Sequence, residues 1–127
     1  MSQMPTESTF PKYDTTEYYD AYCKFLLYGS AKGSIPKSIR IFNKVGDAYG
    51  FLTDITYIVD FEKKIEFALS ATIYVNANEI FNDDKYEYET VGYPFMKNLG
   101  KAIYDYEITR ERKYKPNLKK FKIVYDK

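Results

Sequence analysis

Residues 38–75, SIRIFNKVGDAYGFLTDITYIVDFEKKIEFALSATIYV, decide the fold, because they contain three runs with the composition of β-strands. The first run alternates Ile39, Ile41 and Asn43 with charged or aromatic side chains, the second is β-branched and aromatic, and the third is almost continuously apolar. The connections are short, and short connections join antiparallel neighbours. The segment therefore predicts a three-stranded antiparallel meander, with strands at residues 38–44, 51–60 and 65–75 and connections at residues 46–50 and 61–64.

Helical spacing flanks the meander on both sides. Asp14-Thr15-Thr16-Glu17 fits a capping box, in which Asp14 accepts from the Glu17 backbone, and it predicts a helix that Gly29 ends. Its apolar positions are Tyr18, Tyr22 and Phe25. The spacing of Phe95, Leu99, Ala102, Ile103 and Tyr106 predicts a second helix from Pro94 to about Arg112. We therefore predict the α+β class, with an N-terminal and a C-terminal helix packed on one face of the sheet.

The chain of 127 residues is expected to form one domain. Residues 1–12 contain two prolines and are predicted to be a flexible arm, while residues 13–127 form the single α+β domain. The polar, acidic residues 76–92 are predicted to be a long loop. The basic C-terminal tail 110–127 has eight basic and two acidic residues, a net charge of +6, and is expected to be solvated or to dock on the acidic segment 79–89. Residues 121–125 are expected to add a short strand or to pack down as an extension.

Missing residue types restrict the chemistry. Without histidine, and with Cys23 as the only thiol, the chain cannot form a Ser-His-Asp or Cys-His centre, an intrachain disulfide or a Cys/His zinc site. We expect Cys23 to be a buried, inert thiol. The segment Asn82-Asp83-Asp84 lacks the Gly and terminal Glu of an EF-hand, so we assign no metal and no cofactor. The net charge of +1 offers no global argument for nucleic acid as a partner.

The N-terminus has neither the basic start nor the apolar run of a signal peptide, and no segment has the length of a membrane span. The sequence therefore indicates no export signal and leaves the compartment open. The 15 Tyr and 9 Phe residues suit either a platform for sugars or bases or a protein core. We expect core or half-buried positions with the hydroxyl at the rim for Tyr18, Tyr22, Tyr57, Tyr74, Tyr104 and Tyr106.

The tripeptide Lys44-Val45-Gly46, late in the first strand, resembles the Lys-Thr-Gly motif of serine β-lactamases and penicillin-binding proteins. The resemblance implies that Lys44 is an electrostatic anchor for a substrate carboxylate and that Gly46 permits close approach of the ligand. It also places the backbone N–H of Asp47 at the oxyanion position. In that family two antiparallel strands and a C-terminal helix follow the motif, so the resemblance covers residues 13–127 but only the C-terminal part of the family's domain.

Two departures limit what the resemblance implies. Val45 stands where the family has Thr or Ser, which removes a hydroxyl from the substrate site. The family's Ser-x-x-Lys nucleophile is also missing: Ser34-Ile35-Pro36-Lys37 matches the pattern but contains a helix-breaking Pro36. Tyr74-Val75-Asn76 matches the family's Tyr-x-Asn element but follows Lys44 instead of preceding it.

Two functional hypotheses follow. The first is the C-terminal segment of a β-lactamase-like serine hydrolase, inactive alone, with Lys44, Val45, Gly46 and Asp47 as its substrate-binding edge. It would bind an acyl or carboxylate substrate only with the missing half, would self-associate through an exposed sheet face, and would be periplasmic or extracellular if its parent is exported. The second is a stand-alone, aromatic-rich α+β module that binds a ligand or protein, with a closed core, a monodisperse monomeric state and an aromatic-lined pocket.

Overall fold

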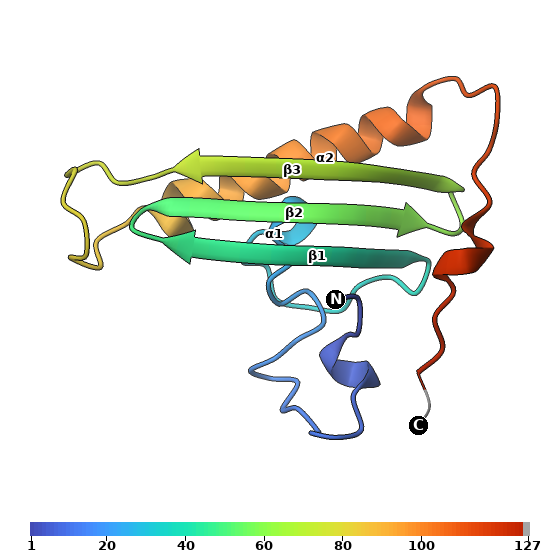
Figure 1. Ribbon diagram of the computed structural model, residues 1–127, viewed down its shortest axis with the longest axis horizontal. Coiled ribbons are helices and arrows are strands. Elements are labelled where there is room, and N and C mark those ends of the chain that lie inside the picture. The colour runs from blue at the N-terminus through green and yellow to red at the C-terminus, as the bar shows by residue number, and fades with distance from the viewer. Residues whose placement is uncertain (126–127) are drawn as a thin grey trace.

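The computed structural model describes residues 1–125 and is built on a three-stranded sheet (Figure 1). The strands β1 (Ile39–Ala48), β2 (Phe51–Asp60) and β3 (Ile65–Tyr74) pair antiparallel in the order β1-β2-β3. This confirms the predicted meander and the α+β class. The strand β1 runs four residues beyond its predicted end, because the turn consists only of Tyr49 and Gly50, with φ of 53° and 89°. Positive φ at both positions is the hairpin turn that matches strand twist.

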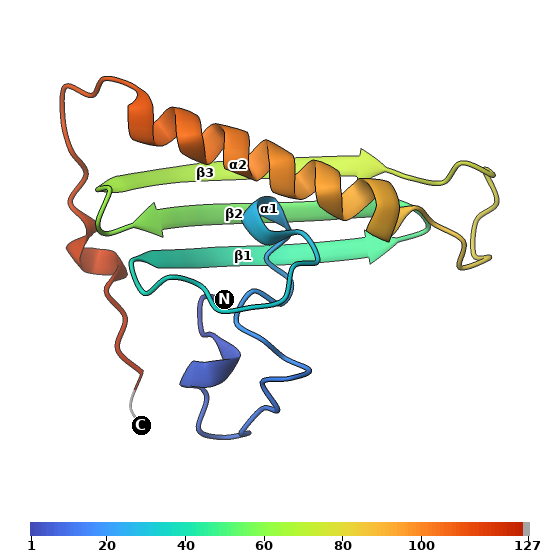
Figure 2. The same ribbon diagram turned by 180° about the vertical axis from the view of Figure 1, so that it is seen from behind.

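The register assigns each side chain to one of two faces. Ile41 lies opposite Ile58, and Ile58 lies opposite Phe67, so these three side chains share one face. We call it the inner face, because α1 (Phe25–Tyr28) and α2 (Tyr93–Thr109) both cover it, as Figure 2 shows. Both helices therefore lie on one face of the sheet, as predicted. The opposite face, which the helices leave uncovered, is the outer face.

The predicted N-terminal helix from Asp14 is wrong, since α1 has only four residues. Asp14 caps a single turn: its carboxylate accepts from the Thr16 N–H at 2.8 Å rather than from Glu17. Further along, the chain bonds to the sheet instead of to itself. The Leu26 N–H donates to Asp54 at 3.0 Å, and the Cys23 carbonyl accepts from Asn43 at 2.7 Å. These tertiary hydrogen bonds replace the helical ones, and α1 still ends at Gly29, as predicted.

The second helix is observed close to its predicted position. It begins at Tyr93 and ends at Thr109, three residues before the predicted end, and a π-helical turn (Tyr88–Gly92) precedes it where a loop was predicted. Gly100 allows α1 to approach, because a Cβ at this position would lie 2.8 Å from the Leu27 nitrogen. The helix pair therefore packs by backbone contact as well as through side chains.

The C-terminal tail crosses to the outer face. A short 3₁₀ helix (Leu118–Phe121) carries Phe121 onto Phe42 and Tyr57, with ring centroids 5.7 and 5.3 Å apart. The described residues 121–125 form no strand, so the expectation of a packed extension is right and that of an added strand is wrong. Asp126 and Lys127, which the predicted tail includes, lie outside the described residues.

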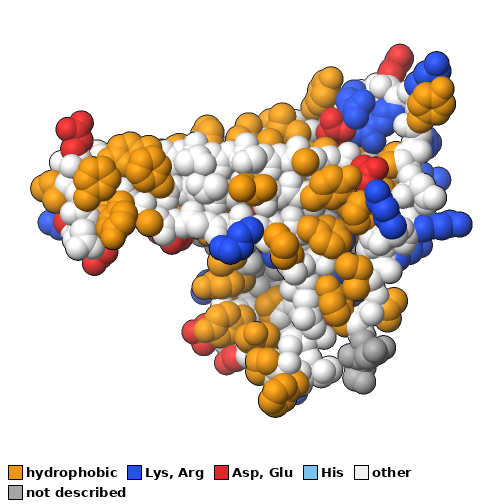
Figure 3. Space-filling view, in the orientation of Figure 1, with side chains coloured by type: hydrophobic (Ala, Val, Ile, Leu, Met, Phe, Trp, Pro, Cys, Tyr) orange, Lys and Arg blue, Asp and Glu red, His pale blue; other side chains and the backbone are white. Residues whose placement is uncertain are grey.

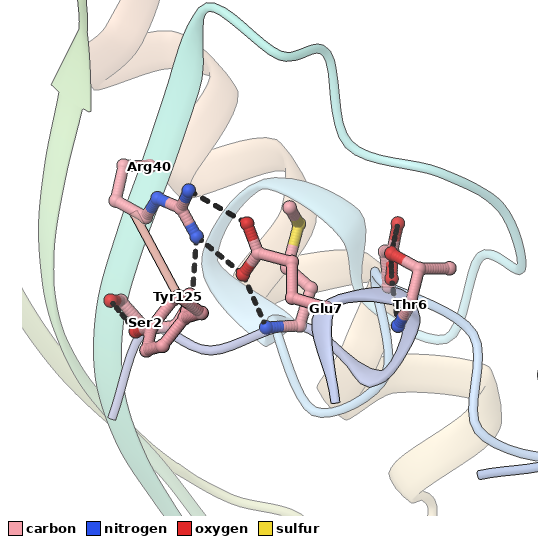
Figure 4. Close-up of polar contacts among 7 residues, drawn as sticks. Ser2, Thr6, Glu7, Arg40 and Tyr125 are labelled. Atoms are coloured by element: carbon pink, nitrogen blue, oxygen red, sulfur yellow. Dashed lines mark hydrogen bonds and ion pairs between the residues drawn. The ribbon is translucent and has the colours of Figure 1, made fainter. Parts of the chain in front are cut away.

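Residues 1–12, expected to be a flexible arm, make specific contacts with β1 and the tail (Figure 4). Arg40 forms a two-bond ion pair with the Glu7 carboxylate at 2.7 and 2.8 Å, and it also donates to the Ser2 carbonyl. The Ser2 and Tyr125 hydroxyls are 3.0 Å apart. Burial alone would raise the pKa of Glu7, but its hydrogen bonds to Arg40 and the Met4 N–H outweigh burial and lower the pKa.

Candidate functional site

The structure divides the four predicted site residues between the two faces of β1. Lys44 and Gly46 belong to the outer face, whereas Val45 and Asp47 alternate onto the other side. Lys44 is exposed, and its ammonium group donates to the neighbouring Val45 carbonyl at 2.6 Å. Lysine and glycine therefore share one face, and the side chain of Asp47 does not.

In residues 1–125, no further strand pairs with β1 on the side that faces away from β2. The Phe61 N–H donates to the Ser38 carbonyl at 2.8 Å, so even-numbered residues of this strand bond to β2. Antiparallel pairing alternates, and the odd-numbered residues Val45 and Asp47 therefore direct their N–H and C=O groups away from the sheet. The N–H of Asp47 thus lies at a free strand edge, and the ammonium group of Lys44 covers the free carbonyl of Val45.

The two motif matches found by sequence pattern do not form a nucleophilic site. Ser34 and Lys37 are both exposed in the loop before β1, and no hydrogen bond of the described residues joins them. Tyr74 ends β3, and Asn76 is buried beyond it, where its amide donates to the Ile80 carbonyl at 3.2 Å. None of these side chains contacts Lys44 through a hydrogen bond.

An aromatic cluster occupies the end of the outer face next to the β1–β2 turn, where Figure 3 shows hydrophobic side chains gathered on the left. Phe51 packs on Tyr74 with ring centroids 4.6 Å apart, and Phe81 lies 6.5 Å from Tyr74 and 6.4 Å from Tyr49. Phe51 and Tyr74 remain 47% and 44% exposed. The expectation of half-buried or core positions is therefore wrong for Tyr74, and also for the exposed Tyr22 and Tyr106.

A hollow of about 340 Å³ lies beside this aromatic cluster, between the β1–β2 turn and the loop that precedes α2. Tyr88 lines this hollow, and its hydroxyl accepts from the Gly50 N–H at 2.9 Å. Burial, reinforced by the charge of Asp47, raises the pKa of Tyr88. Neither Asp47 nor Asp84 takes part in any ion pair of the described residues. The lining residues are Asp47, Ala48, Tyr49, Asp84, Tyr86 and Tyr88.

A buried polar cluster, which no sequence motif indicated, lies under the inner face. Asp54 is fully buried and accepts from Asn43 at 3.1 Å, and Asn43 accepts from the Lys24 ammonium at 2.7 Å. Burial raises the pKa of Asp54 and lowers the pKa of Lys24, although each charge opposes the shift of the other. The available signal was an acidic residue at an inward position of an otherwise apolar strand.

Cys23, next to this polar cluster, is half-buried rather than fully buried. Burial raises the pKa of its thiol, and the positive charge of Lys24 only partly opposes this. The thiol is therefore protonated at neutral pH and is a poor nucleophile. This environment agrees with a structural role for the cysteine.

A second hollow, of about 510 Å³, lies between the N-terminal arm and the segment before α1. Tyr13, Tyr18 and Tyr22 line one side, and their neighbouring ring centroids are 5.6 Å apart. Asp20 faces the same hollow but already accepts from the Thr6 hydroxyl at 2.8 Å. The polar groups of this hollow hold the arm in place.

Comparisons with protein families, with curated proteins and with solved structures find no match to this chain. In residues 1–125, no helix has the length and apolar character needed to cross a bilayer. The same part of the chain contains no group of three or more acidic or cysteine side chains arranged to hold a metal ion.

Proposed function

We propose that this chain is a protein-binding module that recognises its partner with the outer face of the sheet. The observation that carries the proposal is the aromatic cluster around Phe51 and Tyr74, which is ordered by ring packing and yet open to solvent. Packed aromatic side chains on an accessible surface are the usual anchors of protein interfaces. The inner face cannot serve this purpose, because α1 and α2 cover it.

The centre of the outer face supports close approach of a partner. Thr53 and Thr72 bond to each other through their hydroxyls at 2.8 Å, and Ala68 and Ser70 are small and exposed. Stacked sheets lie about 10 Å apart with interdigitating side chains, so small side chains leave room for larger side chains of a partner. Ile55, exposed by 58%, adds an apolar contact in the same region.

The polar surroundings favour protein over nucleic acid as the partner. The loop at residues 76–92 contains five acidic residues and one lysine, and it borders the aromatic cluster. Phosphate groups would meet this negative charge at close range. A partner with basic and apolar side chains suits the surface better.

A second candidate function is the C-terminal segment of a β-lactamase-like serine hydrolase. The specific observation in its favour is the β1 edge, where Lys44 and Gly46 share the outer face and the Asp47 N–H is free. In this proposal the outer face is covered by the missing half of the same domain rather than by a separate protein. The chain alone would bind a carboxylate ligand weakly and would form no acyl-enzyme.

A displayed library of random peptides tests the first proposal. Peptides selected on the folded chain are expected to shift the amide resonances of Phe51, Tyr74 and their neighbours. Phe51→Ser should weaken such peptides at least tenfold, because it removes an exposed aromatic anchor. Phe95→Ser is the matched control, since Phe95 is 42% exposed but belongs to α2.

Selected peptides that bind equally well to Phe51→Ser and wild type would contradict the proposal. Benzylpenicillin tests the second candidate on the same labelled protein. Weak shifts confined to Lys44, Gly46 and Asp47, without covalent labelling of any serine, would support the hydrolase segment. Unchanged resonances at these three residues would reject it, and a covalent serine adduct would refute its inactivity.

A further inference from the structure

The two ends of the sheet carry opposite charge. At one end, the segment between β3 and α2 contributes Glu79, Asp83, Asp84, Glu87 and Glu89; we call this the acidic end. At the other end, the β2–β3 turn and the tail contribute Lys63, Lys64, Lys113, Lys115, Lys120 and Lys122; we call this the basic end. Figure 3 shows the lysine and arginine side chains gathered at the right, opposite the aromatic cluster.

These charges are not neutralised inside the molecule. The ion pairs of the described residues join Glu7, Asp105 and Glu107 to nearby basic groups, and none involves the residues that define the two ends. The lysines of the basic end lie over aromatic rings instead: the Lys120 ammonium is 4.8 Å from the Phe121 ring and that of Lys122 is 5.9 Å from Phe61. Both ends therefore keep charge available for a partner.

The sheet prevents the tail from docking on the acidic loop of its own chain, which was one sequence expectation. Strands of ten residues hold the two ends about 33 Å apart, at about 3.3 Å per residue. This separation is about four Debye lengths at physiological ionic strength. Attraction between the two ends of one copy is therefore screened. The ends of two different copies can come into direct contact, where the distance between their charges is shorter than the Debye length.

We infer that the partner of the outer face is a second copy of this chain, placed antiparallel across a two-fold axis. This inference rests on the proposed function, because it names the occupant of the same surface. In this arrangement the acidic end and aromatic cluster of each copy face the basic end of the other. The contact between an acidic end and a basic end is then made twice, and the assembly closes as a dimer.

The basic end is suited to this contact because its charge is also on the outer face. Phe121 packs on the outer-face residues Phe42 and Tyr57, and Lys120 and Lys122 flank it. Lysine ammonium groups would meet the exposed Glu79 and Asp84, which flank Phe81 of the aromatic cluster, together with exposed aromatic rings. This contact combines ion pairing with cation–π interaction. The small, exposed side chains of Ala68 and Ser70 let the two copies approach over β3.

The size of the face indicates a weak dimer. Three strands about 4.8 Å apart and about 33 Å long present roughly 480 Å² in projection. Stable interfaces bury about 800 Å² on each partner. We therefore expect a dissociation constant of about 10–100 µM at 50 mM salt, weakening about tenfold or more at 500 mM salt as the charges are screened.

Sedimentation equilibrium of the whole chain over 5–500 µM tests the inference with two charge-reversed variants. Glu79→Lys with Asp84→Lys reverses two exposed charges of the acidic end, and Lys120→Glu with Lys122→Glu reverses two charges of the basic end. Each variant alone should dimerise at least tenfold more weakly, because like charges then face each other at both contacts. An equimolar mixture of the two should regain the affinity, since it forms a heterodimer with opposite charges at both contacts.

Lys32→Glu with Lys97→Glu is the matched control. It reverses two exposed lysines outside the outer face, one after α1 and one on α2, and should leave the association unchanged. Circular dichroism confirms that each variant is folded.

A chain that stays monomeric at 500 µM and 50 mM salt would overturn the inference, as would a mixture of variants that fails to associate. Species that grow beyond the dimer with concentration would replace the closed dimer by a head-to-tail chain and would also overturn it. The peptide selection is independent of these results. If selected peptides bind the outer face of a monomeric chain, the proposed function stands and only the second copy is rejected.

Discussion

Replacing Asp54, the acceptor at the centre of the buried polar cluster, should destabilise the fold strongly. Asp54 accepts from the Leu26 N–H at 3.0 Å and from Asn43 at 3.1 Å, and it is fully buried. Hydrogen bonds to an ionised group contribute about 1.5–3 kcal/mol each, but burial of the carboxylate offsets part of this. For Asp54→Ala we expect a loss of about 3 kcal/mol, because Leu26 and Asn43 are left without an acceptor.

Asp54→Asn separates the hydrogen bonds from the charge. The amide oxygen still accepts from the Leu26 N–H, so the expected loss is about 1 kcal/mol at pH 7. Burial raises the pKa of Asp54 above 3.8, so its protonation stabilises the wild type. That contribution is fully present below the unfolded-state pKa and is lost as pH rises through the folded-state pKa. The disadvantage of Asp54→Asn should therefore be larger at pH 3.5 than at pH 7.

Urea unfolding followed by circular dichroism at 222 nm measures both effects, and tyrosine fluorescence provides a second probe in a chain without tryptophan. A loss below 1 kcal/mol for Asp54→Ala would refute the structural role of the buried polar cluster. A disadvantage of Asp54→Asn that grows between pH 3.5 and pH 7 would refute the direction of the pKa shift.

Three further predictions concern packing, the N-terminal arm and the thiol. Gly100→Ala should lower the free energy of unfolding in urea by about 1–2 kcal/mol, because the new Cβ lies within 3.0 Å of backbone atoms of α1. This clash outweighs a helix-propensity gain of about 1 kcal/mol. Gly46→Ala is the control, because a Cβ at Gly46 has nothing within 4 Å. Glu7→Gln should expose residues 2–7 to faster amide exchange at pH 7. Because the pKa of Glu7 is lowered from 4.5, this difference from wild type should be full above pH 4.5 and should shrink as pH falls through the lower folded-state pKa; a difference that grows as pH falls would contradict the ion pair. Since burial raises the pKa of Cys23, iodoacetamide should alkylate the native chain at least tenfold more slowly than the chain in urea at pH 7.5, and equal rates would contradict this.

The two faces of the sheet separate stability from recognition. On the inner face, Leu52 and Ile58 are fully buried against the helices, and Asp54 between them fixes the backbone of α1. On the outer face, the large side chains at one end are covered by the tail, and those at the other end are exposed to solvent. Phe42 and Tyr57 are covered by Phe121 of the tail, while the aromatic cluster at the opposite end has no comparable cover in residues 1–125. The uncovered end is the part that we assign to binding.

The proposed dimer and the hydrolase segment make opposite demands on this surface. A β-lactamase-type domain would cover the outer face with its own missing half, so Phe51 and Tyr74 would be buried in the complete protein. A dimer needs the same side chains exposed in the folded chain, as they are here. Charge-swap rescue in the mixed variants would therefore favour the module, because a missing domain half predicts no such reciprocity.

The sequence alone was sufficient to predict the three strands and α2, because their side-chain periods of two and 3.6 residues are local properties. It also located Gly29 at the end of α1 and Lys44 on the first strand, but it assigned Gly46 to the connection, whereas β1 includes Gly46. The hairpin turn was placed less well, since the pairing of Ala48 with Phe51 depends on strand register rather than on composition.

Only the tertiary structure decided the remaining features. The helix predicted from Asp14 is absent because Asp54 and Asn43, about 20 to 30 residues away, take the backbone groups of Leu26 and Cys23. The exposure of Phe51 and Tyr74 follows from both helices packing on the same face, which strand alternation does not specify. The separation of the acidic and basic ends is likewise set by strand length and chain path. The sequence gives the number and sign of these charges, but the distance between them depends on the folded sheet.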